Sequence, residues 1–431
     1  MTTRKVPLAV ALLAACICTA SSAGSDAVSD EWRRAIERAT TAYLEGDYAR
    51  AEALSSEAIL RLRSGSPCVE AEVRLLTIRG DAQGEQEHFG KARDSYEEAL
   101  RIAAESLTVD HELTVSALTA LAILETSVGN PAEAERRALE AMRIVSSWEK
   151  SRAQSDASTI GIGVVLRDLG RYREAKQVFE IALVAQRAKY GPGHINTAVA
   201  TAGVAYVDFE LGHYEAAYGN LRSALAVLEV ALGEDHSFAL HGRARLALVA
   251  SRLGRHEEAI RLSRSALEAA SSGAKVETAD RARLETIAAE LLFRARRLDE
   301  AELMSDRALA TWRESKSDRI PDQTRALLVS GLIHFQQGER GLAKRAFEAT
   351  WSRRVELQGP NHPDTARAAV LLGMVEVLDG EHKSGIERIE IAVSHLQARL
   401  GEGHPDVRES KAVLLASRER AGESSSNDES D

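Results

Sequence analysis

The sequence is poor in cysteine, proline and aromatic residues. Its 431 residues include 3 cysteines, 8 prolines and 4% aromatic side chains. Three cysteines cannot supply a disulfide framework for a chain of this length, so a hydrophobic core must hold the fold together. The strand-like alternation of apolar and polar residues is also missing. These absences predict an all-α protein, because so few prolines leave long stretches free to form helices.

Basic residues are also fewer than acidic residues. The chain has 55 lysines and arginines against 65 aspartates and glutamates, which gives a formal net charge of -10. A net-acidic chain is poorly suited to bind the phosphates of nucleic acid or to adhere to anionic lipid. We therefore expect a protein or peptide partner and no nucleic acid.

The N-terminus lacks an apolar run long enough to span a bilayer. Arg4 and Lys5 are followed by the uncharged stretch Val6–Ala15, which has the form of an export signal and is too short for a membrane helix. The sequence thus predicts a signal peptide over 1–23 and a linker over 24–29.

The place of cleavage decides the location of the mature chain. The stretch "LAAC" at Leu13–Cys16 resembles the lipobox of bacterial lipoproteins, which implies acylation of Cys16. Ordinary secretory cleavage after Ala23 is the alternative, since Ser21 and Ala23 are the small residues that such a site needs. We expect an exported protein. It is either a periplasmic or outer-membrane lipoprotein, held to the membrane only by an N-terminal lipid anchor, or a secreted protein.

One motif recurs along most of the chain. "LGRYREAKQVFEIAL" begins at Leu169 and "LGHYEAAYGNLRSAL" at Leu211. The glycine of this motif, or the residue in its place, is named the repeat marker, and markers follow one another every 41 or 42 residues. A fixed period of this size is typical of a solenoid. The nine markers are Gly46, Glu87, Gly129, Gly170, Gly212, Gly254, Arg296, Gly338 and Gly380.

A second column stands seven residues before each marker and contains only alanine and glycine. Such small side chains let two antiparallel helices approach to about 8 Å. The marker glycine suits the turn between them because it accepts positive φ after a helix end. This small-residue column consists of Ala39, Gly80, Ala122, Gly163, Ala205, Ala247, Ala289, Gly331 and Gly373.

These columns resemble the tetratricopeptide repeat. The 42-residue period, with "GPNHPDTA" from Gly359 and "GEGHPDV" from Gly401, is similar to its kinesin-light-chain type; repeats of the HEAT type share the length range but not the columns. The resemblance implies a right-handed superhelical solenoid of about nine helix-turn-helix repeats over 30–404. A capping helix over 405–421 and a disordered acidic tail over 422–431 are expected to follow.

No catalytic, metal-binding or nucleotide-binding motif is present, so we expect no enzyme activity, no metal and no cofactor. Five histidines do recur, each eighteen residues before a marker position, but they cannot share a metal ion. Neighbouring units lie about 8 to 10 Å apart, whereas zinc lies about 2 Å from its nitrogen ligands. We interpret them as capping or packing residues of the turns between units. They are His111, His194, His236, His362 and His404.

The resemblance also implies which residues face the concave side of the solenoid, namely those thirteen and three positions before the marker. Arginine side chains pair with carboxylates, and phenylalanine rings supply apolar pockets, so this pattern predicts an extended acidic peptide as ligand. The alternative is that the arginines are solvated or paired with local acids such as Glu285 and Glu290. The candidates are Arg283, Arg325 and Arg367 in one column and Phe209, Phe293 and Phe335 in the other.

The sequence therefore predicts a protein-interaction scaffold of the cell envelope, which binds an acidic peptide or a partner helix in its concave groove. Two alternatives remain open at this point. One is an enzyme or a substrate-binding accessory with a dispersed site, and the other is a structural scaffold that associates with itself.

Overall fold

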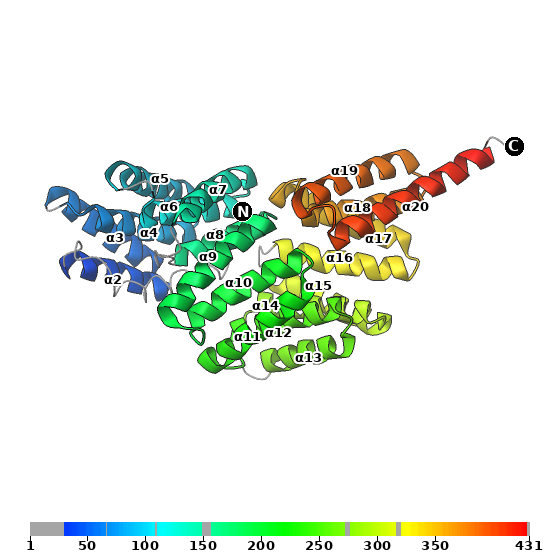
Figure 1. Ribbon diagram of the computed structural model, residues 1–431, viewed down its shortest axis with the longest axis horizontal. Helices are drawn as coiled ribbons and strands as arrows, with labels where there is room; N and C mark the ends of the chain where they lie inside the picture. The colour runs from blue at the N-terminus through cyan, green and yellow to red at the C-terminus, as the bar shows by residue number, and fades with distance from the viewer. Residues whose placement is uncertain are drawn as a thin grey trace. The chain divides into compact units, whose positions relative to one another are not determined.

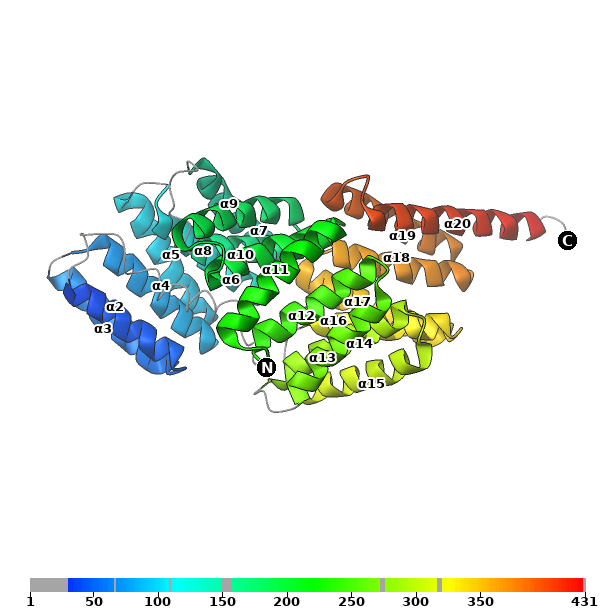
Figure 2. The same cartoon turned by 60° about the horizontal axis from the view of Figure 1, so that its bottom comes forward.

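The computed structural model describes residues 30–428 apart from short internal stretches, and within this part the chain is entirely helical. It forms 19 helices and no strand there, which confirms the all-α prediction (Figures 1 and 2). None of these helices is both long and apolar enough to cross a membrane. The described ranges are 30–65, 67–107, 110–148, 157–271, 276–315 and 320–428.

Helices α2 to α19 form nine helix-turn-helix repeats, as the marker spacing predicts. The two helices of a repeat pack on each other, and a second helix also packs on the first helix of the next repeat, as α17 does on α18. The first helices are α2 (Asp30–Leu44), α4 (Val69–Glu85), α6 (Glu112–Ser127), α8 (Ala157–Asp168), α10 (Ile195–Glu210), α12 (Ser237–Arg252), α14 (Thr278–Arg294), α16 (Ile320–Gln336) and α18 (Pro363–Leu378). The second helices are α3 (Tyr48–Ser64), α5 (Phe89–Ser106), α7 (Pro131–Ser147), α9 (Tyr172–Tyr190), α11 (Tyr214–Leu232), α13 (His256–Ser271), α15 (Leu298–Ser315), α17 (Arg340–Gln358) and α19 (His382–Leu400).

The repeats divide into two compact units. The first contains the described residues up to 169 together with 174–203. The second contains the short turn 170–173 and the described residues from 204 onward. The arginine column that the sequence singles out lies wholly in the second unit.

The final helix, α20 (Pro405–Asp428), ends later than the sequence predicts. Residues 422–428 were expected in a disordered tail, but the helix continues through them. No proline follows Pro405 to stop the helix, and Gly422 alone only weakens it. Residues 429–431 of the expected tail lie outside the described part.

Each marker ends a first helix in the left-handed backbone conformation, as predicted. All nine markers have a positive φ, between 62° and 94°. At the first turn the amide of Gly46 donates to the carbonyl of Tyr43, and the amide of Asp47 donates to that of Ala42. These two bonds are those of a Schellman C-cap. Glu87 and Arg296 adopt the same conformation without being glycine.

The small-residue column marks the closest contact between paired helices. Its five alanines have no exposed surface. A Cβ atom added to Gly80 would lie 2.4 Å from the ring of Tyr96, and one added to Gly331 would lie 2.6 Å from the ring of Phe347. Any larger side chain in this column must push its two helices apart.

The five recurrent histidines cap helices, which confirms their interpretation as capping residues. In each case Nδ1 accepts a hydrogen bond from the backbone amide two residues later, at 3.1 to 3.2 Å. This bond satisfies one of the unpaired amides at the start of a first helix. Within the described residues no cluster of histidine, cysteine and carboxylate side chains is arranged to hold a metal ion.

We predict that Glu87→Gly stabilises the protein by about 0.5 to 1 kcal/mol. The left-handed conformation costs a non-glycine residue about 1 to 2 kcal/mol, and part of this gain is offset by the greater freedom of glycine in the unfolded chain. Urea unfolding measures the difference. The control is Glu97→Gly inside α5, which must destabilise the chain. An unchanged or lower midpoint for Glu87→Gly contradicts the prediction.

Candidate functional site

The arginine column lies near the starts of three successive first helices. Arg283, Arg325 and Arg367 occupy the same position in α14, α16 and α18, so the stacking of the repeats arranges them in order. Their side chains keep 32%, 27% and 23% of their surface exposed. They are therefore partly accessible to a ligand, although each of them also has partners within the chain.

All three arginines join neighbouring repeats, and two of them pair with an acid of the next repeat. Arg283 Nε donates to Asp322 Oδ2 over 3.0 Å, and Arg367 Nε donates to Asp406 Oδ2 over 2.5 Å. In both pairs the acid lies 39 residues after the arginine and directly follows the proline at the start of a helix. The sequence explains these acids as favourable partners of the helix dipole. The structure adds a second role for them, because they connect one repeat to the next.

The third arginine, Arg325, pairs within the column of first helices. Its Nε and Nη2 atoms donate to Glu290 Oε2 over 2.9 and 2.7 Å. Arg294 donates to the other oxygen of the same carboxylate over 3.0 Å. Burial alone would raise the pKa of Glu290, but Arg325, Arg294 and Arg252 outweigh it and hold the pKa well below its ordinary value. The pairing with Glu290, which the sequence offered as the alternative to ligand binding, is present for Arg325, whereas Glu285 pairs with Arg307.

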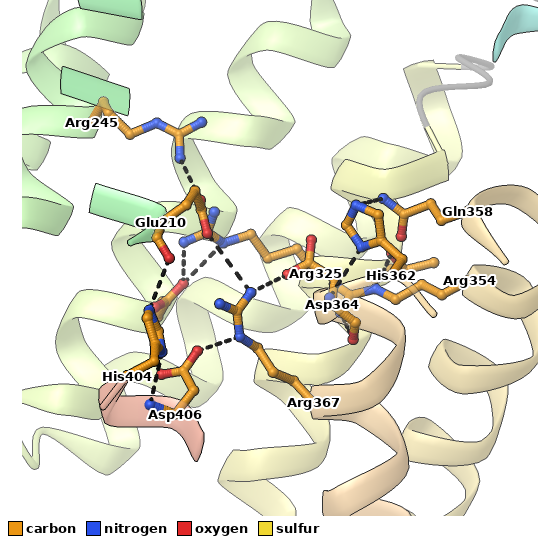
Figure 3. A network of polar contacts seen from close by, with 12 residues as sticks. Glu210, Arg245, Arg325, Arg354, Gln358, His362, Asp364, Arg367, His404 and Asp406 are labelled. Atoms are coloured by element: carbon orange, nitrogen blue, oxygen red, sulfur yellow. Dashed lines mark hydrogen bonds and ion pairs between the residues drawn. The ribbon is translucent and has the colours of Figure 1, made fainter. Parts of the chain in front are cut away.

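Arg367 lies at the centre of a wider network (Figure 3). Besides Asp406, its guanidinium contacts Asp364 Oδ1 at 2.5 Å and Glu210 Oε2 at 3.7 Å. Glu210 also lies 3.8 Å from Arg245. Burial disfavours the charged guanidinium, but the surrounding carboxylates outweigh burial and raise the pKa of Arg367 above its ordinary value. The group is permanently cationic.

Within the described residues, two arginines of this network make no hydrogen bond to a carboxylate. Arg252 lies over the rings of Phe209 and Tyr214, 5.9 and 5.8 Å from their centroids. Arg354 is buried and donates to the hydroxyl of Thr324 and to a backbone carbonyl. Their charges act on nearby carboxylates all the same: Arg252 lowers the pKa of Glu290, and Arg354 lowers that of Asp364.

The network consequently carries more positive than negative charge. Counted over the described residues named below, it contains six arginines and four carboxylates, an excess of two positive charges. Partly buried charge of one sign favours a ligand of the opposite sign. The arginines are Arg245, Arg252, Arg294, Arg325, Arg354 and Arg367, and the carboxylates are Glu210, Glu290, Asp364 and Asp406.

The structure does not bring the three candidate phenylalanines together. Phe209 is only 8% exposed and belongs to the core around α10 to α14. Phe293 and Phe335 are half-buried and pack against two other hydrophobic clusters. Of the three, Phe209 is the one that contacts the arginine network, through Arg252. The remaining candidate, Cys16, and the whole predicted export signal lie outside the described residues.

Comparison with known proteins identifies the repeat. Residues 75–147 and 155–229 match the family model of the tetratricopeptide repeat. These two stretches are similar to tetratricopeptide repeats. No curated protein matches the whole sequence or part of it.

Several solved structures share this fold at low sequence identity. The apo form of RapI is 15% identical and aligns over 67% of this chain and 99% of its own, with a TM-score of 0.52. A Rap protein complexed with Competence and Sporulation Factor is 14% identical over 91% and 97% of the two chains, with a TM-score of 0.52. The apo quorum sensor NprR from B. thuringiensis is 11% identical over 85% and 99%, with a TM-score of 0.53. At such identities the likeness establishes a tetratricopeptide-type fold and nothing further.

Part of the network was not predicted from the sequence, although its residues recur at one position of the repeat. The residues two positions before three successive markers are Glu210, Arg252 and Arg294. The same spacing that identifies Arg283 also identifies these positions. The charge changes sign between Glu210 and Arg252, which obscures the pattern. The contacts of Arg354 have no such signal, because this residue belongs to a second helix.

A separate polar cluster lies in the first unit of the tetratricopeptide array. The hydroxyl of Tyr96 donates to Asp81 Oδ1 over 2.6 Å, and that of Tyr43 donates to Glu85 Oε1 over 3.5 Å. Burial raises the pKa of Asp81 to about 7, and the nearby charge of Glu85 adds to this effect, while the Tyr96 hydrogen bond opposes it. Asp81 therefore titrates near neutral pH.

This cluster generates a prediction about stability. The raised pKa means that the folded chain binds the Asp81 proton more tightly than the unfolded chain does. Stability from this group is thus greatest at acidic pH and falls as pH rises from about 4 to 7. Asp81→Asn, whose amide oxygen still accepts from Tyr96, should stabilise the chain at pH 8 by roughly 1 to 4 kcal/mol and much less at pH 5.

Urea midpoints of the two proteins across this pH range provide the measurement. Asp94→Asn, an exposed change in α5, serves as the control and should have no pH-dependent effect. A constant difference between Asp81→Asn and the wild type across the range would show that Asp81 does not titrate there.

Proposed function

We propose that this tetratricopeptide-repeat protein is a protein-interaction scaffold that binds an extended acidic segment of a partner along α12 to α18. One observation carries the proposal, namely the excess positive charge of the arginine network. Carboxylates of a partner would neutralise this excess, and the regular spacing of the first helices suits an extended chain. The concave groove expected from the repeat type would hold this segment.

The arginines have donors left for such a ligand. A guanidinium has five N–H groups, and Arg325 uses two of them on Glu290. Arg252 lies over two aromatic rings, and its charge also acts on Glu290 and Asp406, but it makes no hydrogen bond to an acid within the described residues. A carboxylate of the partner can thus bind Arg252 without displacing an acid of this chain.

The comparisons lend limited support. One structure with this fold was solved complexed with Competence and Sporulation Factor, and another belongs to a quorum sensor. These relatives bind their own ligands, and the fold alone transfers none of them to this chain. What the relatives add is that helical arrays of this kind can hold a bound ligand.

We also propose that the scaffold acts in the cell envelope. The basic start, the short apolar run and "LAAC" at Leu13–Cys16 favour a lipoprotein acylated at Cys16, and secretion after cleavage at Ala23 is the alternative. Incorporation of a fatty-acid analogue into the wild type but not into Cys16→Ser would support the anchor. A soluble product beginning near Gly24, with no label, would contradict it.

A synthetic peptide tests the binding proposal. The probe is a fluorescent peptide of glutamates with two phenylalanine anchors, and its counterpart has glutamine in place of glutamate. We expect the acidic peptide to bind more tightly and to lose affinity as salt increases. Arg252→Gln should weaken binding about tenfold, which corresponds to ~1.4 kcal/mol. Fluorescence anisotropy measures both effects.

The matched control is Arg222→Gln. Arg222 also lies over a tyrosine ring, that of Tyr218, but belongs to the second helix α11. It should leave affinity unchanged. Equal binding of the two peptides, or equal losses for Arg252→Gln and Arg222→Gln, would overturn the proposed ligand.

A further inference from the structure

Two segments of the second unit that lie far apart in the sequence contact each other. His404, at the start of α20, places its Nε2 atom 2.9 Å from the backbone carbonyl oxygen of Glu210, at the end of α10. The marker Gly212 lies so close to Pro405 that an added Cβ would be 2.9 Å from the proline ring. The end of α10 thus lies directly against the start of α20.

The same contact occurs one repeat earlier. An added Cβ at the marker Gly170 would lie 2.4 Å from the ring of Pro363, at the start of α18. Arg173 also donates to the carbonyl of Leu400 over 3.0 Å. The steps from Gly170 to Gly212 and from Pro363 to Pro405 both equal 42 residues. The second unit therefore closes on itself through two equivalent contacts.

His404 can make its contacts only as a neutral imidazole. Its Nδ1 accepts the backbone N–H of Asp406 over 3.1 Å, so this nitrogen carries no proton. The carbonyl of Glu210 can only accept, so Nε2 carries the one proton and donates it. A second proton on Nδ1 would face the amide of Asp406 and break the helix cap.

The charges around the ring also oppose a second proton. Asp406 on its own helix favours it, but Arg367 of α18 and Arg252 of α12 disfavour it. The Glu210 carbonyl of α10 stabilises the Nε2 proton. The net effect of burial and of these groups is a pKa of His404 below its ordinary value.

We propose that the contact between the end of α10 and the start of α20 is a latch, held by neutral His404, that opens when acidification protonates this imidazole. The latch closes the second unit at neutral pH. Protonation removes the cap of α20 and adds a third cation beside Arg367 and Arg252. The turn at Gly212 and the proline at 405 then lose the contact that holds them together.

The carboxylates nearby do not account for opening in the same range. The guanidinium groups outweigh burial and lower the pKa of both Asp406 and Asp364. These acids remain charged until the pH falls below the ordinary range of an aspartate. A lowered histidine pKa means stability that is present at neutral pH and is lost as pH falls through the folded-state value. The latch should therefore open between the pH at which His404 is protonated and the lower pH at which Asp406 and Asp364 are protonated.

A distance measurement across the latch tests the proposal. Nitroxide labels are placed on cysteines at the exposed positions Ala216 and Arg408 of the full chain, with Cys16, Cys18 and Cys68 replaced by serine. We expect one short distance at pH 7.5. At pH 5 a second, longer distance should appear, and it should vanish when the sample is returned to pH 7.5.

Two variants assign the effect to His404. His404→Asn retains a capping acceptor but cannot titrate, so the distance distribution should become independent of pH. His236→Asn changes an equivalent cap whose ring stacks on Phe238 instead, and it should open on acidification like the wild type. A wild type with one distance at both pH values, or His404→Asn that still opens with acid, overturns the latch. The wild-type titration decides the matter even if His404→Asn fails to fold.

Discussion

The close approach of the two helices within each repeat is the constraint on which the rest of the structure depends. At Gly80, Gly163 and Gly331 of the small-residue column, an aromatic ring of the second helix occupies the space of the missing Cβ. The ninth repeat shows the limit of this approach. A Cβ on Gly373 would lie 2.7 Å from the carbonyl oxygen of Gly385, and one on Gly385 would lie 2.6 Å from that of Gly373. Gly385 stands five residues after its marker, where the other eight repeats have alanine. Its lack of a Cβ thus matches that of Gly373.

This packing sets the positions of the polar side chains. Because every repeat is built alike, residues at the same position of successive first helices become neighbours in space. An arginine thirteen residues before one marker can therefore meet the acid at the start of the next first helix, as Arg283 meets Asp322. The column that could bind an acidic partner also connects the repeats. The packing of the repeats therefore fixes the spacing of the arginines, and a ligand must match that spacing.

Much of the fold could be predicted from the sequence, because each signal was local. The marker column predicted the turn conformation even where Glu87 and Arg296 replace glycine, and the histidine positions predicted the caps. The pairing of Glu210 with His404 could not be predicted, since 194 residues separate them and small rotations between repeats accumulate along the chain. Of the three candidate arginines, Arg325 and Arg367 belong to the polar network, whereas Arg283 pairs with Asp322. Their partners, apart from Glu290, depended on contacts between repeats that no local pattern specifies.

The most direct test of the helix-contact constraint is a comparison of Ala247→Leu with Ala216→Leu. Ala247 belongs to the small-residue column and is fully buried, whereas Ala216 is exposed on α11. Urea unfolding should show a loss of about 1 to 3 kcal/mol for the buried change, as overpacking causes, and a change within about 0.5 kcal/mol for the exposed one. Equal midpoints for both variants and the wild type would contradict the account, because the paired helices would then have room that the structure denies them.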